Sequence, residues 1–91
     1  MSSLNNNLPY ENIPEQFRGG LERYFELGIE PGHFLQAVLQ NNLTDTVSRA
    51  DDPSLAALKT IVQWLYMEAP GGSWGSADAY EKTIKDGGAI F

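Results

Sequence analysis

The chain has 91 residues and a mass of 10.1 kDa, the size of one small domain, so it has no room for two hydrophobic cores. It has no cysteine and one histidine, which excludes disulfides, thiolate metal sites, cysteine nucleophiles and multi-histidine metal sites within one chain. Twelve acidic and six basic residues give a net charge of −6, which disfavours direct binding to nucleic acid or to an anionic membrane.

The first residues are polar, and we expect a flexible N-terminal arm over residues 1–11 and a single helical domain over residues 12–91. Leu8 and Tyr10 are the side chains through which this arm could dock. The longest apolar runs are far shorter than a membrane span, and the N-terminus lacks the basic and apolar regions of a secretory signal. These features predict a soluble, intracellular protein.

The first predicted helix starts at Asn12, an N-cap residue with Pro14 in the first turn and Glu15 in the capping-box position. Its apolar residues recur at helical spacing, at Phe17, Leu21, Tyr24 and Phe25. We expect Gly28 to end this helix in a left-handed conformation. A second helix is predicted to have Pro31 at its first position and to stop or bend at residues 41–42.

A short third helix is predicted over residues 43–50, and a fourth begins with Asp52 as its cap and Pro53 at its first position. The fourth helix runs to about residue 67, with a predicted buried stripe of Leu55, Leu58, Ile61, Val62, Leu65 and Tyr66. A loop over residues 70–75 leads to a last helix that Ser76 can cap and that ends at Gly87-Gly88, with Tyr80 and Ile84 facing inward. Because no alternating strand pattern occurs, the predicted class is all-α, a compact bundle of about five short helices.

A series of short motifs extends from the first predicted helix to the last loop. They are Ile13-Pro14-Glu15, Arg18-Gly19-Gly20-Leu21, Arg23-Tyr24, Gly28-Ile29, Pro31-Gly32, Phe34-Leu35, Ala37-Val38-Leu39, Asn41, Leu43, Arg49-Ala50-Asp51, Leu65-Tyr66, Ala69-Pro70 and Trp74-Gly75-Ser76. Together they cover most of the chain, which resembles a group of short accessory proteins of tailed phages and prophages. The resemblance implies a setting, the host bacterial cytoplasm, in which small phage proteins are often directed at host defences, and it carries no catalytic residues with it.

The first helix contains a glycine pair, Gly19-Gly20, although each interior glycine costs about 1 kcal/mol relative to alanine. The pair suits either close helix packing or the close approach of a ligand. Arg18 and Arg23 flank it, and their planar guanidinium groups suit contact with a phosphate. Alternatively, these arginines form pairs within the helix, Arg18 with Glu22 and Arg23 with Glu26.

Gly32 and His33 lie at the predicted start of the second helix, where free backbone N–H groups can bind an anion. The simpler interpretation is a plain helix start, with Glu30 balancing the helix dipole. Trp74 lies in a glycine-rich loop, where it is either a stacking platform for a base or an anchor that holds the loop to the core. Tyr24 and Ser76 complete the set of candidate ligand-binding residues.

No nucleophile, base and oxyanion donors occur together, so we expect a protein without catalytic activity, cofactor or metal. The predicted function is to bind and sequester a small anionic signalling molecule derived from a nucleotide, as a homo-oligomer with pockets between protomers. The alternative is an inhibitor or adaptor that docks an acidic face, which includes Glu22 and Glu26, on a basic host protein such as a defence protein. A structural virion component is a third possibility.

Overall fold

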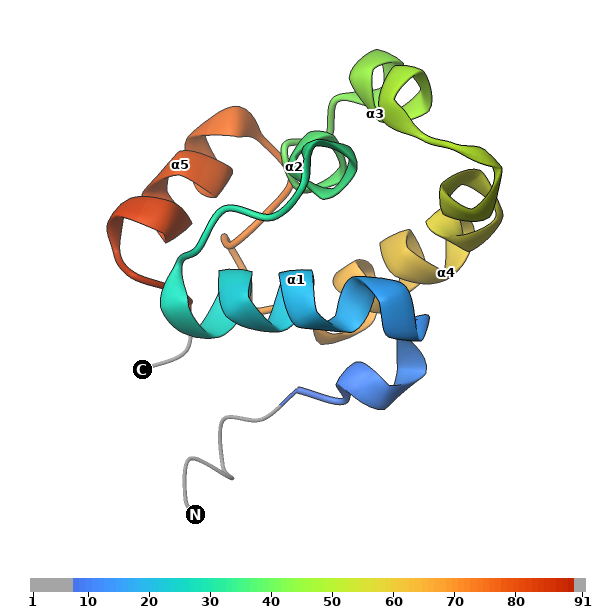
Figure 1. Cartoon of the computed structure of the whole chain (residues 1–91). Helices are drawn as coiled ribbons and strands as arrows, with labels where there is room; N and C mark the ends of the chain where they lie inside the picture. Colours follow the sequence, from blue (N-terminus) through green and yellow to red (C-terminus); the bar gives the residue numbers. More distant parts are fainter. Residues whose placement is uncertain (1–7, 90–91) are drawn as a thin grey trace.

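The computed structural model describes residues 8–89, which form five α-helices, one 3-10 turn and no strand (Figure 1). The elements are η2 (Tyr10–Asn12), α1 (Glu15–Leu27), α2 (His33–Leu39), α3 (Leu43–Arg49), α4 (Asp52–Glu68) and α5 (Ala77–Lys85). The radius of gyration of 12.2 Å equals the value of about 12 Å expected for a compact chain of this length. The predicted all-α class and helix number are therefore confirmed for this range.

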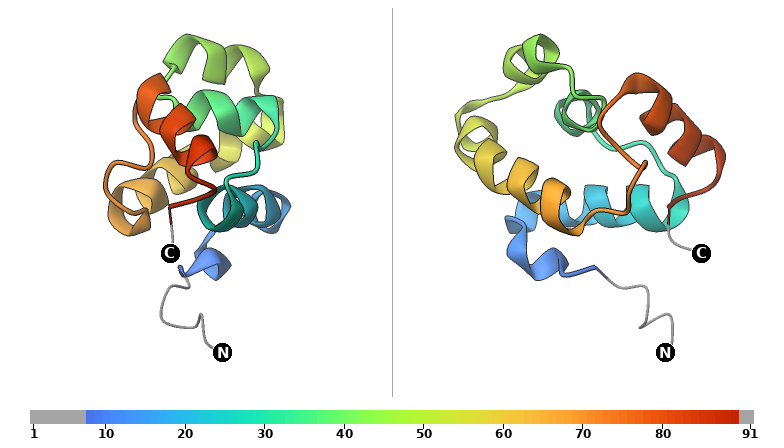
Figure 2. Two further views of the ribbon diagram at one scale, coloured as in Figure 1. Left: turned by 90° about the vertical axis from the view of Figure 1, so that its left-hand side faces the viewer. Right: turned by 180° about the vertical axis from the view of Figure 1, so that it is seen from behind.

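Helix α2 lies between the other four helices. It is seen nearly end-on at the centre of Figure 1, with α1 below it, α3 above it and α5 and α4 at the two sides, and the view from behind in Figure 2 shows the same arrangement. Three of the helices begin with a side-chain cap, at Asn42, Asp51 and Ser76, whose oxygen accepts the N–H three residues further on at 2.9 to 3.0 Å. Such caps satisfy backbone donors that the first turn leaves free. The cap of α5 is the predicted one, whereas that of α4 is Asp51, one residue before the predicted Asp52.

The predicted start of α1 at Asn12 is wrong. Asn12 ends the preceding 3-10 turn, in which the Ile13 N–H donates to the Tyr10 carbonyl at 2.9 Å, and the helix begins three residues later at Glu15. The N-cap position falls on Pro14, which has no side chain that could cap. A local turn therefore replaces the predicted capping box.

The predicted start of α2 at Pro31 is also wrong, because the helix begins at His33 with Gly32 in an extended conformation as its N-cap. Pro31 is buried and precedes the helix, and its carbonyl accepts a hydrogen bond of 2.8 Å from the Gln36 side chain. This side-chain contact takes the place of a further helical turn. The predicted stop at residues 41–42 is confirmed, since α2 ends at Leu39.

An aromatic cluster forms the centre of the core and joins three helices. The Tyr24 ring of α1 stacks on Tyr80 of α5 with centroids 5.4 Å apart, and it contacts the edge of Phe25 at 5.0 Å. Phe25 in turn packs on Trp64 of α4 at 5.9 Å. The largest fully buried side chains are Tyr24, Phe25, Ile13, Leu21, Leu39, Ile61 and Leu65.

Residues 8–11, at the end of the predicted arm, pack against the helical domain. Tyr10 stacks on Trp64 with a centroid distance of 5.6 Å, and the Trp64 Nε1–H donates to the Pro9 carbonyl at 3.0 Å. Leu8 is partly buried against the same core. The remainder of the predicted arm, residues 1–7, lies outside the described residues.

The C-terminal ends of α1 and α5 meet at a junction made by glycines. Gly28 ends α1 with a φ of 70°, as predicted, and a Cβ at this position would lie 2.7 Å from the backbone of Gly87 and Gly88. Close by, the Ala89 N–H donates to the Phe25 carbonyl at 2.6 Å. Only glycine lets the two backbones approach this closely.

The buried face of α4 differs from the predicted stripe. Three of the six residues predicted to be buried are exposed: Leu55 by 43%, Val62 by 38% and Tyr66 by 84%. The buried residues are instead Ser54, Ala57, Ile61, Trp64 and Leu65. Between residues 53 and 67 the helix has one charged side chain, Lys59, so the sequence offers two apolar faces and the packing of Trp64 on the aromatic cluster selects one of them.

Candidate functional site

A groove of about 270 Å³ lies between α3 and α4, where the end of α2 and the loop before α5 complete its walls. The lining is mainly apolar and contains no charged side chain. It consists of Val38, Asn41, Asn42, Leu43, Thr46, Leu58, Val62, Trp74 and Gly75. Trp74 lines this groove and is partly buried, so part of its surface stays accessible to a ligand.

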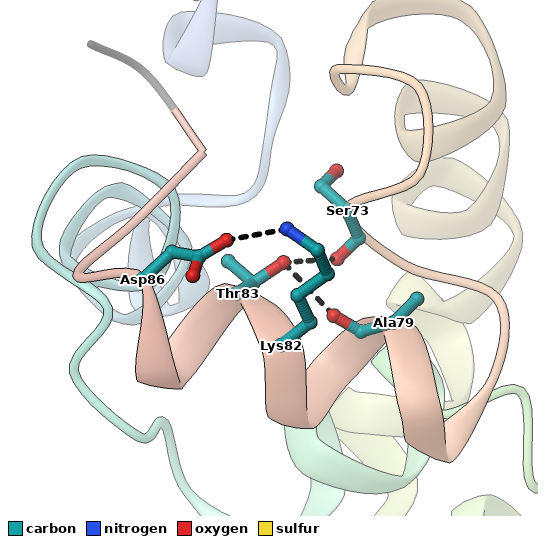
Figure 3. Close-up of polar contacts among 5 residues, drawn as sticks. All are labelled: Ser73, Ala79, Lys82, Thr83 and Asp86. Atoms are coloured by element: carbon teal, nitrogen blue, oxygen red, sulfur yellow. Dashed lines mark hydrogen bonds and ion pairs between the residues drawn. The ribbon is translucent and has the colours of Figure 1, made fainter.

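The loop that carries Trp74 is held at three points. The Gly75 N–H donates to the Leu39 carbonyl at 2.8 Å, while the Ser73 carbonyl accepts the Tyr24 hydroxyl at 2.7 Å and that of Thr83 at 3.3 Å. Figure 3 shows Ser73 against the α5 side chains. These bonds secure the neighbours of Trp74 on both sides, and Trp74 itself packs against the core, as the anchor interpretation predicts.

The turn between α2 and α3 supplies the polar end of the groove. Asn41 has a φ of 60°, a left-handed conformation that asparagine tolerates better than most residues. Asn42 caps α3 with its side chain, and its carbonyl accepts the Thr46 hydroxyl at 2.7 Å. The turn is thereby fixed, and it places amide and hydroxyl groups beside an otherwise apolar surface.

Two cationic side chains follow groove-lining residues closely in the chain. Lys59 comes directly after Leu58, and Arg49 lies one helical turn after Thr46. Both are exposed, and the one ion pair in residues 8–89, at 2.6 Å, is formed elsewhere, between Lys82 and Asp86 (Figure 3). The Asp51 carboxylate near Arg49 is engaged as a helix cap, and its hydrogen bonds with Ser54 lower its pKa.

Arg18 and Arg23 do not converge on a ligand site within the protomer. The Arg18 guanidinium donates to the carbonyls of Ile13 and Glu11, at 2.7 and 3.0 Å, and so holds the turn before α1. The exposed Arg23 side chain lies over Gly19, where a Cβ would be 3.0 Å from its Nη1 atom. The helical pairs of these arginines with Glu22 and Glu26 are absent from the described part of the chain.

The two glycines of α1 have different surroundings. A Cβ on Gly20 would lie 3.1 Å from the Leu35 side chain and 3.7 Å from Pro31, so this glycine allows α1 to pack closely on α2. The space beside Gly19 is filled only by the end of Arg23. Close helix packing, one of the two interpretations of the pair, therefore explains Gly20.

The remaining candidates lie apart from one another. Gly32 and His33 are exposed at the start of a seven-residue helix, and Ser76 is engaged as the cap of α5. Tyr24 is fully buried, so it supports the loop through Ser73 and does not contact a ligand. Trp74 alone among the nine candidates lines the groove.

Sequence reasoning missed most of the groove. The residues it missed are Val38, Asn41, Asn42, Leu43, Thr46, Leu58, Val62 and Gly75. Four of these are apolar helix residues that the same periodicity would assign to a core. The sequence does show the Asn41-Asn42 pair, but from it we predicted only the end of the second helix and not a polar wall of the groove.

Acidic residues of α1 and of the loop that follows it act on two tyrosines, the partly buried Tyr10 and the buried Tyr80. Burial raises the pKa of Tyr10, and the charges of Glu26 and Glu22 raise it further. Burial likewise raises the pKa of Tyr80 to about 12, with a further contribution from the charge of Glu30. These glutamates therefore present negative charge that the two arginines of α1 do not neutralise by direct pairing.

Comparison with protein-family models, with curated proteins and with solved structures finds no match to this chain. Within residues 8–89, no three metal-ligating side chains come together, and none of the helices has the length and apolar character needed to cross a bilayer. The groove and the charges around it are therefore the evidence from which a function is proposed.

Proposed function

We propose that the protein is a non-catalytic binder of a small anionic nucleotide-type signalling molecule, and that the groove holds the base of this ligand against Trp74. The partly buried Trp74 in the wall of the groove carries this proposal. In the setting that the resemblance to phage accessory proteins implies, binding sequesters a host defence signal in the bacterial cytoplasm.

The groove offers the two kinds of contact that a base requires. An aromatic face stacks on any base and contributes about 1–3 kcal/mol per base. The Asn41 amide can both donate and accept hydrogen bonds, which suits the edge of a base, and Asn42, whose oxygen caps α3, can still donate through its nitrogen. The apolar walls exclude water from these contacts and strengthen them.

The phosphate is expected at the rim of the groove and not in its interior. No cation lines the interior, whereas Arg49 and Lys59 follow the lining residues on the two facing helices. Arg18 was the predicted phosphate contact, but its donors are engaged by two backbone carbonyls. The proposal therefore assigns the phosphate to Arg49 and Lys59.

The volume of the groove limits what one protomer holds. Sites for drug-sized ligands usually measure about 300–1,000 Å³, and this groove measures about 270 Å³. That volume suits one base, so a ligand with two bases extends beyond the groove. Such a ligand fits the predicted homo-oligomer, in which two protomers each hold one base.

Calorimetric titration with a panel of linear and cyclic nucleotides tests the proposal. The variants are Trp74→Ala, Trp74→Phe and Arg49→Ala, with Arg23→Ala as the matched control because Arg23 is exposed on another helix. We expect Trp74→Ala to weaken binding about tenfold or more, equivalent to at least about 1.4 kcal/mol. Trp74→Phe should retain most of the affinity, because a ring remains for stacking.

The affinities of these variants distinguish a ligand site in the groove from a ligand site on the surface of α1. Arg49→Ala should weaken binding and Arg23→Ala should leave it unchanged. A loss of binding with Arg23→Ala but not with Trp74→Ala would show that the ligand site is on α1 and that the groove is not the site. A protein that binds no nucleotide of the panel would refute the proposed function.

The second candidate is an inhibitor or adaptor that docks its acidic α1 face on a basic host protein. It is favoured by one observation, the absence of ion pairs between the α1 glutamates and Arg18 or Arg23 among the described residues. It predicts capture of a host protein that weakens as salt rises. Glu22→Gln with Glu26→Gln should abolish this capture, and Trp74→Ala should preserve it.

A further inference from the structure

The outward face of α4 carries an apolar row that the described chain leaves largely exposed. Leu55, Leu58, Val62 and Tyr66 follow one another at intervals of three and four residues, so they line one side of the helix, and we call this row the α4 seam. Leu58 is partly buried, and the other three are exposed by 38 to 84%. The row extends for about 16 Å along the helix.

A helix that is apolar on both sides is typical of one that is buried on both sides. The inner side of α4 faces the core through residues such as Ile61 and Leu65, which are fully buried. Its outer side also has the composition of an interface, with few charges and with an aromatic residue and a methionine, Tyr66 and Met67, at one end. The α4 seam therefore has the character of a contact surface.

The distribution of charge indicates which partner can reach the α4 seam. A molecule with a net charge of −6 repels its own copies over most of its surface. Residues 53–67 hold no acidic residue and one base, Lys59, so here two copies can approach without this repulsion. We infer that a second copy of this chain packs its own α4 seam against this one, in the antiparallel direction.

The position of Lys59 favours the antiparallel direction. Lys59 and Tyr66 are seven residues apart, about 20° around the helix, so both lie along the same edge of the α4 seam. An antiparallel pair centred between Val62 and Gln63 brings Lys59 of each copy beside Tyr66 of the other. The dimer then has two equivalent contacts between a Lys59 ammonium group and a Tyr66 ring. A parallel pair would instead place the two positively charged Lys59 side chains level with each other.

The proposed dimer interface adjoins the groove, but the dimer is expected to form whether or not the groove binds a ligand. Leu58 and Val62 belong both to the α4 seam and to the lining of the groove, so the second copy lies against the α4 wall of the groove. Leu55 and Tyr66 belong to the α4 seam alone. Their substitution therefore tests self-association separately from ligand binding.

Sedimentation equilibrium of the full chain, up to about 100 µM, gives the test. The wild type should have twice the chain mass of 10.1 kDa, about 20 kDa, and Leu55→Glu combined with Tyr66→Glu should be monomeric. Both residues are exposed and glutamate is a good helix former, so circular dichroism should show a folded variant. Leu27→Glu is the matched control, because Leu27 is exposed by 60% on α1, and it should leave the dimer intact.

Cysteine cross-linking then tests the antiparallel direction, since the chain has no cysteine of its own. Gln63→Cys lies level with the proposed two-fold axis and should form a disulfide-linked dimer faster than Leu55→Cys, an exposed site near the start of the same helix. A parallel pair would bring the two cysteines of Leu55→Cys together, whereas the antiparallel pair holds them apart. A monomeric wild type, or a dimer that persists in the Leu55→Glu/Tyr66→Glu variant, would overturn the interface. Equal cross-linking rates at the two sites would overturn the antiparallel arrangement.

Discussion

The two glycines at positions 19 and 28 of the chain should respond to alanine in opposite directions. Gly28→Ala is expected to destabilise the fold strongly. Its φ of 70° costs an L-residue about 1–2 kcal/mol. The new Cβ would also lie 2.7 Å from the backbone of Gly87 and Gly88, so the end of α5 must move away.

That movement adds a second cost. It separates the Ala89 N–H from the Phe25 carbonyl, which are 2.6 Å apart, and a lost hydrogen bond of this kind is worth about 1 kcal/mol. The total for Gly28→Ala is about 2–3 kcal/mol. Gly19→Ala meets only the end of the exposed Arg23 side chain, which can swing away, so the higher helix propensity of alanine should stabilise the protein by up to about 1 kcal/mol.

Thermal unfolding followed by circular dichroism measures both changes. At about 4–8 °C per kcal/mol for a domain of this size, Gly28→Ala should lower Tm by about 8 °C or more, and Gly19→Ala should raise it by a few degrees. Urea titration at 25 °C provides an independent measure of the free energy of unfolding. A Gly28→Ala variant as stable as the wild type would refute the argument that backbone contact requires glycine there.

Three further variants test the loop, a helix cap and a buried tyrosine. Tyr24→Phe removes the hydroxyl that holds Ser73 and should lower the free energy of unfolding in urea by about 1 kcal/mol; an unchanged value would contradict the role of this bond. Asn42→Ala removes the α3 cap and should cost about 1 kcal/mol in the same assay. Because burial raises the pKa of Tyr80 from 10.0 to about 12, its neutral form stabilises the fold below pH 10, and this contribution is lost as the pH rises through 12. Tyr80→Phe should therefore lose less stability than the wild type over that interval, and equal losses would count against this explanation.

The sequence alone predicts the helices because their signals are local. Gly28 ends α1, Ser76 caps α5 and the Asn41-Asn42 turn separates α2 from α3, as residue type and position indicated. Each signal acts through backbone groups within a few residues of the side chain concerned. The two starts that were wrong, at Asn12 and Pro31, are also local, but there a 3-10 turn and a side-chain contact compete with the helix.

The candidate site was harder to predict because its residues come from four parts of the chain. Trp74 was identified because a tryptophan among glycines is conspicuous in sequence. The structural role of Arg18 was not predicted. Its guanidinium donates to two carbonyls that lie before the helix, and helical spacing gives no indication of such contacts. Tyr24 was counted as a ligand contact, yet its hydroxyl reaches a carbonyl 49 residues away.

Tertiary structure also decided which face of α4 is buried. With one charge between residues 53 and 67, the helix has no polar face that would point its other side to the core. The sequence by itself therefore determined that α4 is a helix and where it begins, to within one residue. Packing determined the rest, because contacts of Ile61, Trp64 and Leu65 with the core fix the rotation of the helix. This rotation leaves Leu55, Val62 and Tyr66 outside.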